Sequence, residues 1–228
     1  MSATAGRSVR PLTKTATFNK WLLHPAVKPA LFIVCLLPFA WLLYGALGDH
    51  LGANPAEALI RRTGDWTLRF LCITLAITPV RTITGLSGLA RLRRMVGLFA
   101  FFYVCLHLLT YSGFDKGFDL PAIWKDIVKR PFILVGFSAF VLLIPLAATS
   151  FNRAIKAMGA KRWQALHKLV YAIACLGILH FFWLRAGKNN FAEVSVYAAI
   201  IAALLGWRVW QFIRKKRLAP APGLRSTT

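Results

Sequence analysis

Acidic residues are scarce in this chain, with 7 Asp and Glu against 29 Lys and Arg and a formal net charge of +22. In a soluble protein this imbalance would suggest nucleic-acid binding. A hydrophobic content of 57% and a mean hydropathy of +0.58 exclude a soluble fold of this size. The basic residues also lie between apolar runs of about 17 to 21 residues, each long enough to cross a bilayer as a helix. The sequence therefore predicts a membrane protein that holds basic loops against anionic lipid, with no nucleic-acid partner.

Paired cysteines and a cleavable leader are also absent from the sequence. The cysteines form no C-x-x-C pair, and each lies in a separate apolar run, which argues against an iron–sulfur cluster or a structural zinc site. We expect them to be buried thiols: Cys35, Cys72, Cys105 and Cys175. No A-x-A cleavage signal follows the first apolar run, so that run is predicted to be an uncleaved first helix.

Six apolar runs predict an all-α membrane protein, a six-transmembrane-helix bundle. The expected helices cover residues 29–47, 66–83, 92–112, 131–149, 165–184 and 191–213. Residues 1–28 would form a basic N-terminal segment, 29–213 the transmembrane domain, and 214–228 a basic, disordered tail.

The loop charges predict the orientation of the bundle. Eighteen Lys and Arg residues fall in the two terminal segments and in the loops after the second and fourth helices, and eight fall on the opposite side. Because cytoplasmic loops carry the excess of basic residues, both termini are expected in the cytoplasm.

Three of the five histidines, His107, His167 and His180, fall inside predicted spans, whereas His24 and His50 lie outside them. Ionisable residues within a span are costly, about 2.5–3.5 kcal/mol for charged types on insertion scales, and so indicate function. A single such histidine could be a neutral imidazole bonded to a neighbouring carbonyl. Three on two helices favour a cofactor instead.

His107 and His180 each lie fifteen residues beyond the predicted start of a helix that runs outward from the cytoplasm. At 1.5 Å rise per residue both sit about 22 Å along their helices, at one level toward the outer face. Two imidazoles at one depth can bind one haem iron from opposite sides. Gly177, three residues before His180, would leave room for the flat macrocycle.

His167 precedes His180 by thirteen residues, about 20 Å along a helix, and cannot share that iron. It would lie near the cytoplasmic face, where a second haem would need a single or unusual protein ligand. At the matching depth the third helix carries Arg93 and Arg94. These arginines could pair with propionates or a phosphate, or serve as positive-inside anchors.

Two runs carry a family resemblance: RLRRMVGLFAFFYVCLHLLTY at 91–111 and RWQALHKLVYAIACLGILHFFW at 162–183. They resemble the third and fifth helices of the ferric-reductase-like transmembrane domain. LLPFAWLLYGALGDHLGANPAE at 36–57 and LAITPVR at 75–81 extend the likeness to a narrower family. The narrower family that these runs resemble is MsrQ (YedZ). Its members are the haem-binding membrane subunits of bacterial MsrPQ methionine sulfoxide reductase systems.

The resemblance implies a haem b electron-transfer subunit in the bacterial inner membrane, with His107, His167 and His180 as haem ligands. Such subunits take electrons from the quinone pool or through a flavin. They deliver them to a periplasmic MsrP-like molybdopterin reductase that repairs oxidised periplasmic proteins. The resemblance also implies FMN, although the sequence shows no flavin motif. The haem number, one or two, stays open because the third helix lacks a second histidine.

No residue set predicts substrate chemistry, so the chain is expected to be an electron-transfer subunit and not the catalytic one. One alternative is a stand-alone transmembrane quinone or metal reductase. Another is a haem-free transporter or membrane scaffold with histidines along a polar path. That alternative predicts further polar residues inside the spans, and few occur: Arg69 and Lys168 lie near span ends and Gln164 at a boundary, which disfavours it.

Overall fold

The computed structural model describes residues 14–187 and 189–218, and within these ranges it is helical with no strand. The first half contains α1 (Lys14–Leu23), α2 (Val27–Leu47), α3 (Pro55–Thr84), the 3₁₀ turn η1 (Ser87–Arg91), α4 (Arg93–Thr110) and the π-helical turn η2 (Tyr111–Asp115). The second half contains α5 (Leu120–Lys129), α6 (Pro131–Ala148), α7 (Asn152–Met158), α8 (Ala160–His167), α9 (Leu169–Ala186) and α10 (Ala192–Leu218). Six of the described helical segments are long and apolar enough to cross a membrane, so the predicted fold class is confirmed.

The second membrane helix, α3, begins at Pro55 and not near residue 66 as hydropathy predicted. Asn54 caps it by accepting a hydrogen bond from the Glu57 amide at 3.1 Å, and proline at the first position is preset for a helix. The helix ends at Gly85, whose φ of +73° suits glycine. Capping extends the helix through a polar stretch that the apolar pattern could not reveal.

The fifth membrane helix is interrupted at Lys168, which separates α8 from α9. Trp163 anchors α8 to the end of α6, because its Nε1–H donates to the Thr149 carbonyl at 2.9 Å. His167 is the last residue of α8 and so is not on the helix that carries His180. The membrane span expected over 165–184 lies within the 27-residue segment Ala160–Ala186 and is confirmed, with a turn at Lys168 that was not expected.

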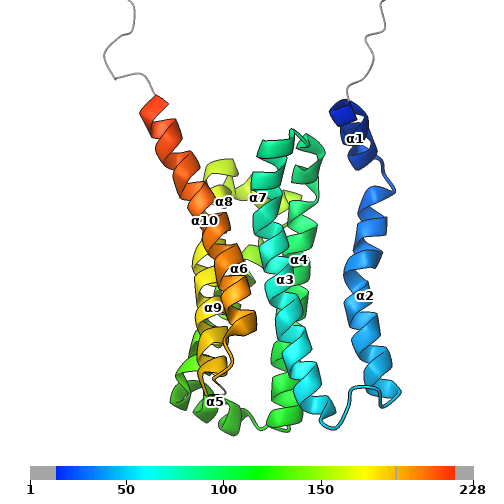
Figure 1. The fold of residues 1–228 in the computed structure, drawn as a ribbon, viewed down its shortest axis with the longest axis vertical. Coiled ribbons are helices and arrows are strands. Elements are labelled where there is room, and N and C mark those ends of the chain that lie inside the picture. Colours follow the sequence, from blue (N-terminus) through cyan, green and yellow to red (C-terminus); the bar gives the residue numbers. More distant parts are fainter. Residues whose placement is uncertain (1–13, 188, 219–228) are drawn as a thin grey trace, which may run out of the picture.

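Two helix pairs form the centre of the bundle, α3 with α4 and α6 with α9 (Figure 1). One buried cluster, with Leu75, Leu143 and Ile173, joins α3, α6 and α9. A second, aromatic cluster with Phe70, Phe99 and Tyr103 joins α3 and α4 to α2. These clusters hold the histidine-bearing helices α4 and α9 in fixed positions.

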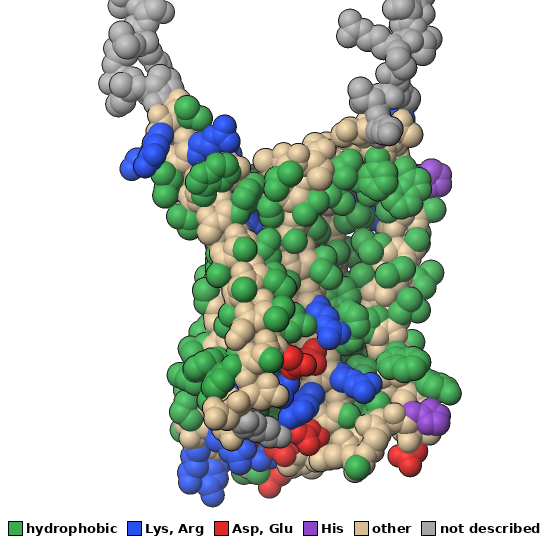
Figure 2. Space-filling model, viewed as in Figure 1, with side chains coloured by type: hydrophobic (Ala, Val, Ile, Leu, Met, Phe, Trp, Pro, Cys, Tyr) green, Lys and Arg blue, Asp and Glu red, His purple; other side chains and the backbone are tan. Residues whose placement is uncertain are grey.

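Apolar side chains are spread over the outside of the bundle, as Figure 2 shows in green along the visible face, with charged side chains gathered in its lower half. On α2, Ile33, Leu37 and Trp41 are 61%, 57% and 64% exposed. Such a surface is suited to lipid, since monomeric soluble proteins rarely expose large continuous apolar patches.

Tyr103 fastens α2 to α4. Its hydroxyl donates to the Cys35 carbonyl at 2.9 Å and accepts from the Phe39 amide at 3.0 Å. The phenol thus inserts into the hydrogen-bond ladder of α2 beside Pro38, where proline already perturbs the helix. This polar contact supplements apolar packing at the same place.

The described chain begins and ends at one end of the bundle, where α1, α8 and the end of α10 lie, while α5 lies at the other (Figure 1). We refer to these as the α8 end and the α5 end. α1 falls within the expected N-terminal segment and α10 extends to Leu218, inside the expected tail. The rest of the tail, residues 219–228, lies outside the described residues.

The α5 end is held by a buried carboxylate, Asp126. It accepts a hydrogen bond from the Tyr111 hydroxyl at 2.7 Å and pairs with Lys116 at 3.0 Å and Arg130 at 2.8 Å. Burial alone would raise the pKa of Asp126, but the hydrogen bonds from Tyr111 and Lys116 and the charge of Arg130 hold that pKa below its usual range. The carboxylate therefore stays ionised and ties α5 to the ends of α4 and α6.

Candidate functional site

His107 on α4 and His180 on α9 face each other across the centre of the bundle, toward its α5 end. Their ring centroids are 6.2 Å apart and their planes 79° apart. This pairing agrees with the equal depth expected from the sequence.

Each ring is held by a carbonyl of a neighbouring helix. Nδ1 of His107 lies 2.8 Å from the Ile60 carbonyl oxygen on α3, and Nδ1 of His180 lies close to the Phe132 carbonyl oxygen on α6, at 2.6 Å. Because a carbonyl only accepts, Nδ1 must carry the proton, which assigns the lone pair to Nε2. Two neutral imidazoles with free Nε2 atoms are the form that binds a metal.

A cavity of about 440 Å³ lies toward the α8 end, among α3, α4, α6, α8, α9 and α10. This volume is within the range of small-molecule and cofactor sites. His167, Arg93 and Arg94 all line it, so the three residues that the sequence placed at this level do meet. Its basic lining residues are Arg81, Arg93, Arg94, His167, Lys168 and Arg208. This lining suits a ligand with acidic groups, and we call the site the cationic cavity.

His167 is held on the wall of this cavity. Its ring stacks on Trp163 with centroids 3.9 Å apart, and Nδ1 lies 3.0 Å from the Trp163 carbonyl oxygen. Nε2 lies 3.5 Å from the Ser150 hydroxyl oxygen, a long contact at the limit of a hydrogen bond. The ring is oriented by its own helix, with Nε2 the less constrained nitrogen.

Arg208, an arginine within the last apolar run, was not predicted from the sequence as a site residue. Its guanidinium donates to the Leu75 carbonyl at 2.7 Å and to the Tyr171 hydroxyl at 3.2 Å, and its buried Nε has no partner in the described chain. An arginine so placed is costly and indicates function. The signal was available, because Arg208 is the one basic residue in the expected span 191–213.

Arg93 and Arg94 make different contacts. Arg93 donates to the Thr78 hydroxyl at 3.3 Å, and Arg94 donates to the Asn152 side-chain oxygen at 2.8 Å. Neither arginine has a carboxylate partner among these contacts, so their charges remain available to an acidic ligand.

Gly177 lies one turn before His180 but does not line the cationic cavity. A methyl group added there would meet Leu68 at 3.9 Å, which is ordinary contact.

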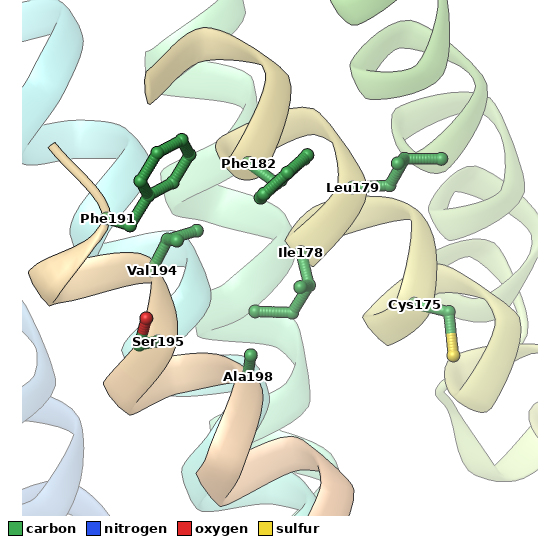
Figure 3. Close-up of a pocket in the computed structure, with 8 residues that line it drawn as sticks. All are labelled: Cys175, Ile178, Leu179, Phe182, Phe191, Val194, Ser195 and Ala198. Atoms are coloured by element: carbon green, nitrogen blue, oxygen red, sulfur yellow. The ribbon is translucent and has the colours of Figure 1, made fainter. Parts of the chain in front are cut away.

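A further recess of about 420 Å³ lies between α9 and α10. Figure 3 shows the apolar side chains of Phe182, Phe191, Val194 and Ile178 around it. The Ser195 hydroxyl and the Cys175 thiol also line it. The exposed Cys175 departs from the expectation of a buried thiol, because its helix face is turned outward.

Charged residues on the helices also gather near the α5 end, where Figure 2 shows basic and acidic side chains side by side. Arg61 pairs with Glu57, and Arg185 pairs with Glu193. Arg69 donates to the Tyr197 hydroxyl at 3.0 Å. Both acidic residues are thus paired, whereas the buried Nε of Arg185 has no hydrogen-bond partner within the described chain.

Comparison with known proteins agrees with this architecture. Residues 63–178 match the family described as ferric reductase like transmembrane component. The chain is 75% identical over 199 residues to the protein-methionine-sulfoxide reductase heme-binding subunit MsrQ of Polaromonas naphthalenivorans, covering 87% of this chain and 91% of that protein. It is 58% identical to MsrQ of Herminiimonas arsenicoxydans (81% and 86% covered) and 50% identical to MsrQ of Rhodospirillum rubrum (85% and 92% covered). No solved structure matches the chain.

The fold and the paired histidines define a multi-pass membrane protein of the ferric-reductase-like class. Within that class, the chain belongs to the MsrQ family of protein-methionine-sulfoxide reductase subunits.

Proposed function

We propose that this chain is a haem b electron-transfer subunit in which His107 and His180 bind one haem iron from opposite sides. The observation that carries the proposal is the 6.2 Å between the two ring centroids. Since an imidazole nitrogen binds a metal at about 2 Å, two imidazoles on either side of one metal have centres roughly 6 Å apart. The names of the MsrQ relatives, which state heme binding, support the same cofactor.

The residues around the pair prepare it for a metal. The carbonyls of Ile60 and Phe132 hold both Nδ1 protons, so each ring presents Nε2 without having to change tautomer. Both imidazoles are neutral before the cofactor arrives, which limits the cost of keeping them inside the bundle. The haem, when bound, supplies one-electron Fe(II)/Fe(III) chemistry, and the protein supplies ligands, apolar surroundings and fixed geometry.

The cationic cavity forms a second cofactor site in this proposal. His167 would serve as a ligand on its wall, and Arg93, Arg94 and Arg208 would pair with acidic groups. A second haem brings propionates and FMN brings a phosphate, and guanidinium groups suit both. The two cofactors differ in colour and in iron, so pigment analysis distinguishes them.

Electrons would cross the bilayer from the α8 end to the α5 end. The excess of basic residues at the termini and in the loops of the α8 end supports a cytoplasmic location for that end, in a bacterial inner membrane. The donor would be a quinone or a flavin reductase, and the acceptor a periplasmic MsrP-like molybdopterin reductase that repairs oxidised proteins. The subunit names of the relatives support a role beside a separate catalytic partner.

The deciding experiment is a dithionite-reduced minus oxidised absorption spectrum of the purified protein, with haem and flavin quantified against protein. Sharp b-type bands are expected, and the haem-to-protein ratio separates one haem from two. A protein without haem, after expression with ample haem supply, would overturn the proposal in favour of a transporter or scaffold. Reduction of quinones or metal ions by the subunit without a partner would favour the stand-alone reductase.

A further inference from the structure

The two histidines of the central pair are positioned by the same device, which occurs once on α3 and once on α6. The carbonyl that receives the His107 proton belongs to Ile60, and Gly64 follows it by four residues. The carbonyl that receives the His180 proton belongs to Phe132, and Gly136 again follows it by four residues. The carbonyl–glycine spacing is therefore identical on two helices that are separate in sequence.

Helix geometry explains the spacing of four. Each Cα–Cβ bond in an α-helix tilts toward the helix N-terminus, so the side chain at one position covers the carbonyl about one turn earlier. Any residue other than glycine at position 64 or 136 would place its Cβ over the carbonyl of Ile60 or Phe132. Glycine leaves that oxygen open to a second donor from a neighbouring helix.

Both histidine rings lie against the backbone at these glycines, as the distances to an added methyl group show. A methyl group added at Gly136 would lie 2.6 Å from Nδ1 and 2.9 Å from Cε1 of His180, a separation that real Cβ atoms do not tolerate. A methyl group added at Gly64 would lie 3.2 Å from both Cε1 and Nδ1 of His107, which is tight but can be relieved by a small shift. By contrast, a methyl group at Gly206 on α10 would meet nothing within 4 Å.

We infer that Gly64 and Gly136 are positioning residues of the histidine pair: each keeps one carbonyl uncovered, and so fixes the tautomer, position and direction of the imidazole that binds the iron. This inference rests on the proposed haem at His107 and His180. On this inference α3 and α6, which carry no ligand of that pair, position both ligands through their backbone.

The test compares Gly64→Ala, Gly136→Ala and the control Gly206→Ala with wild type as purified full-length protein. The readouts are haem content, the reduced-minus-oxidised spectrum, the midpoint potential, and the low-spin electron paramagnetic resonance (EPR) signal of the oxidised iron. Size-exclusion elution in detergent checks that each variant is folded. We expect Gly136→Ala to bind haem roughly tenfold or more weakly, with loss of the two-imidazole low-spin signal, as when an outer-shell partner of a ligand is disturbed.

We expect Gly64→Ala to keep most of its haem but to show shifted g-values and a shifted midpoint potential, since its ring must move by a few tenths of an ångström. Gly206→Ala should match wild type in every readout. If Gly136→Ala does not fold, the g-values and potential of Gly64→Ala decide the question.

Folded glycine variants with wild-type g-values, potential and haem content would overturn the inference and leave the proposed haem site intact. Equal changes in Gly206→Ala would also overturn it, since the effect would not come from the ring contacts. A wild-type protein without haem would instead remove the proposed function, and the inference with it.

Discussion

The imidazole planes of His107 and His180 stand 79° apart, close to perpendicular, while both rings keep the spacing of two ligands of one metal. Perpendicular imidazoles interact with different dπ orbitals of an iron between them and leave those orbitals nearly equal in energy. We therefore predict a strongly anisotropic low-spin EPR signal for the oxidised protein. A rhombic spectrum, typical of parallel ligand planes, would show that at least one ring turns when the cofactor binds.

The histidines should separate into two groups when they are replaced one at a time. His107→Ala and His180→Ala each remove one of the two ligands and are expected to abolish the haem of the central pair. His167→Ala should spare that haem and reduce only the pigment of the cationic cavity, because His167 lies on that cavity's wall. Difference spectra and haem-to-protein ratios measure both effects.

His50→Ala is the matched control for these variants. His50 is exposed and packs on Tyr44 in the connection between α2 and α3, away from both sites. A wild-type spectrum in His107→Ala or His180→Ala would contradict the pairing, as would loss of the central haem in the control.

Arg208 should govern the cofactor of the cationic cavity. Arg208→Leu removes a positive charge from the cavity wall, so we expect weaker binding of that cofactor, or a midpoint potential lowered by roughly 50 mV because the oxidised form loses a repulsive neighbour. Arg208→Lys keeps the charge and should retain most of the potential. Spectroelectrochemical titration measures these shifts.

Arg214→Leu tests whether any charge loss on α10 has the same effect. Arg214 is exposed near the end of α10 and contacts Trp210. Equal shifts in Arg214→Leu and Arg208→Leu would assign the effect to general surface charge and contradict a specific role for Arg208.

Asp126 should stabilise the α5 end in a pH-dependent way. Its pKa is depressed in the folded protein, so its contribution is present above the ordinary carboxyl pKa of 3.8 and is lost as pH falls through the lower folded value. Asp126→Asn should cost about 2 kcal/mol at pH 7, the scale of hydrogen bonds to a charged group. The difference from wild type should shrink as pH falls below 3.8 and through the lower pKa of the folded state.

Thermal unfolding midpoints of wild type and Asp126→Asn in detergent, at pH 7 and near pH 3, measure this effect. Asp119→Asn is a suitable control, because asparagine caps a helix as well as aspartate and Asp119 caps α5 through the Ala122 amide. A difference between Asp126→Asn and wild type that stays constant with pH would contradict the ionic role of Asp126.

The sequence predicted those features that depend on a single helix. Apolar run length located six membrane helices, and rise per residue placed His107 and His180 at one level. The start of α3 was missed because capping at Asn54, and not hydropathy, sets it. The turn at Lys168 was missed because the residues around it include neither glycine nor proline to mark it.

Features that depend on neighbouring helices could not be predicted. Arg208 stood out by chemistry, but its approach to Leu75 on α3 requires the packed bundle. Gly64 and Gly136 carry no chemical signal in the sequence, and their role appears only when the rings of His107 and His180 rest on them. The residue pattern of a helix can be read from one sequence, whereas these roles depend on contacts between different helices.

Each histidine of the pair lies on one helix and contacts the backbone of another. This arrangement bears on the order in which the parts of the bundle are made. The α3–α4 pair, which contains His107 and its Ile60 partner, precedes α6 and α9 in the chain and is therefore synthesised first. The second pair, with His180 seated on Phe132, follows later. Under the proposed ligation, an iron bound by both His107 and His180 would join the α3–α4 pair to the α6–α9 pair, so the cofactor would also hold the two halves of the bundle together.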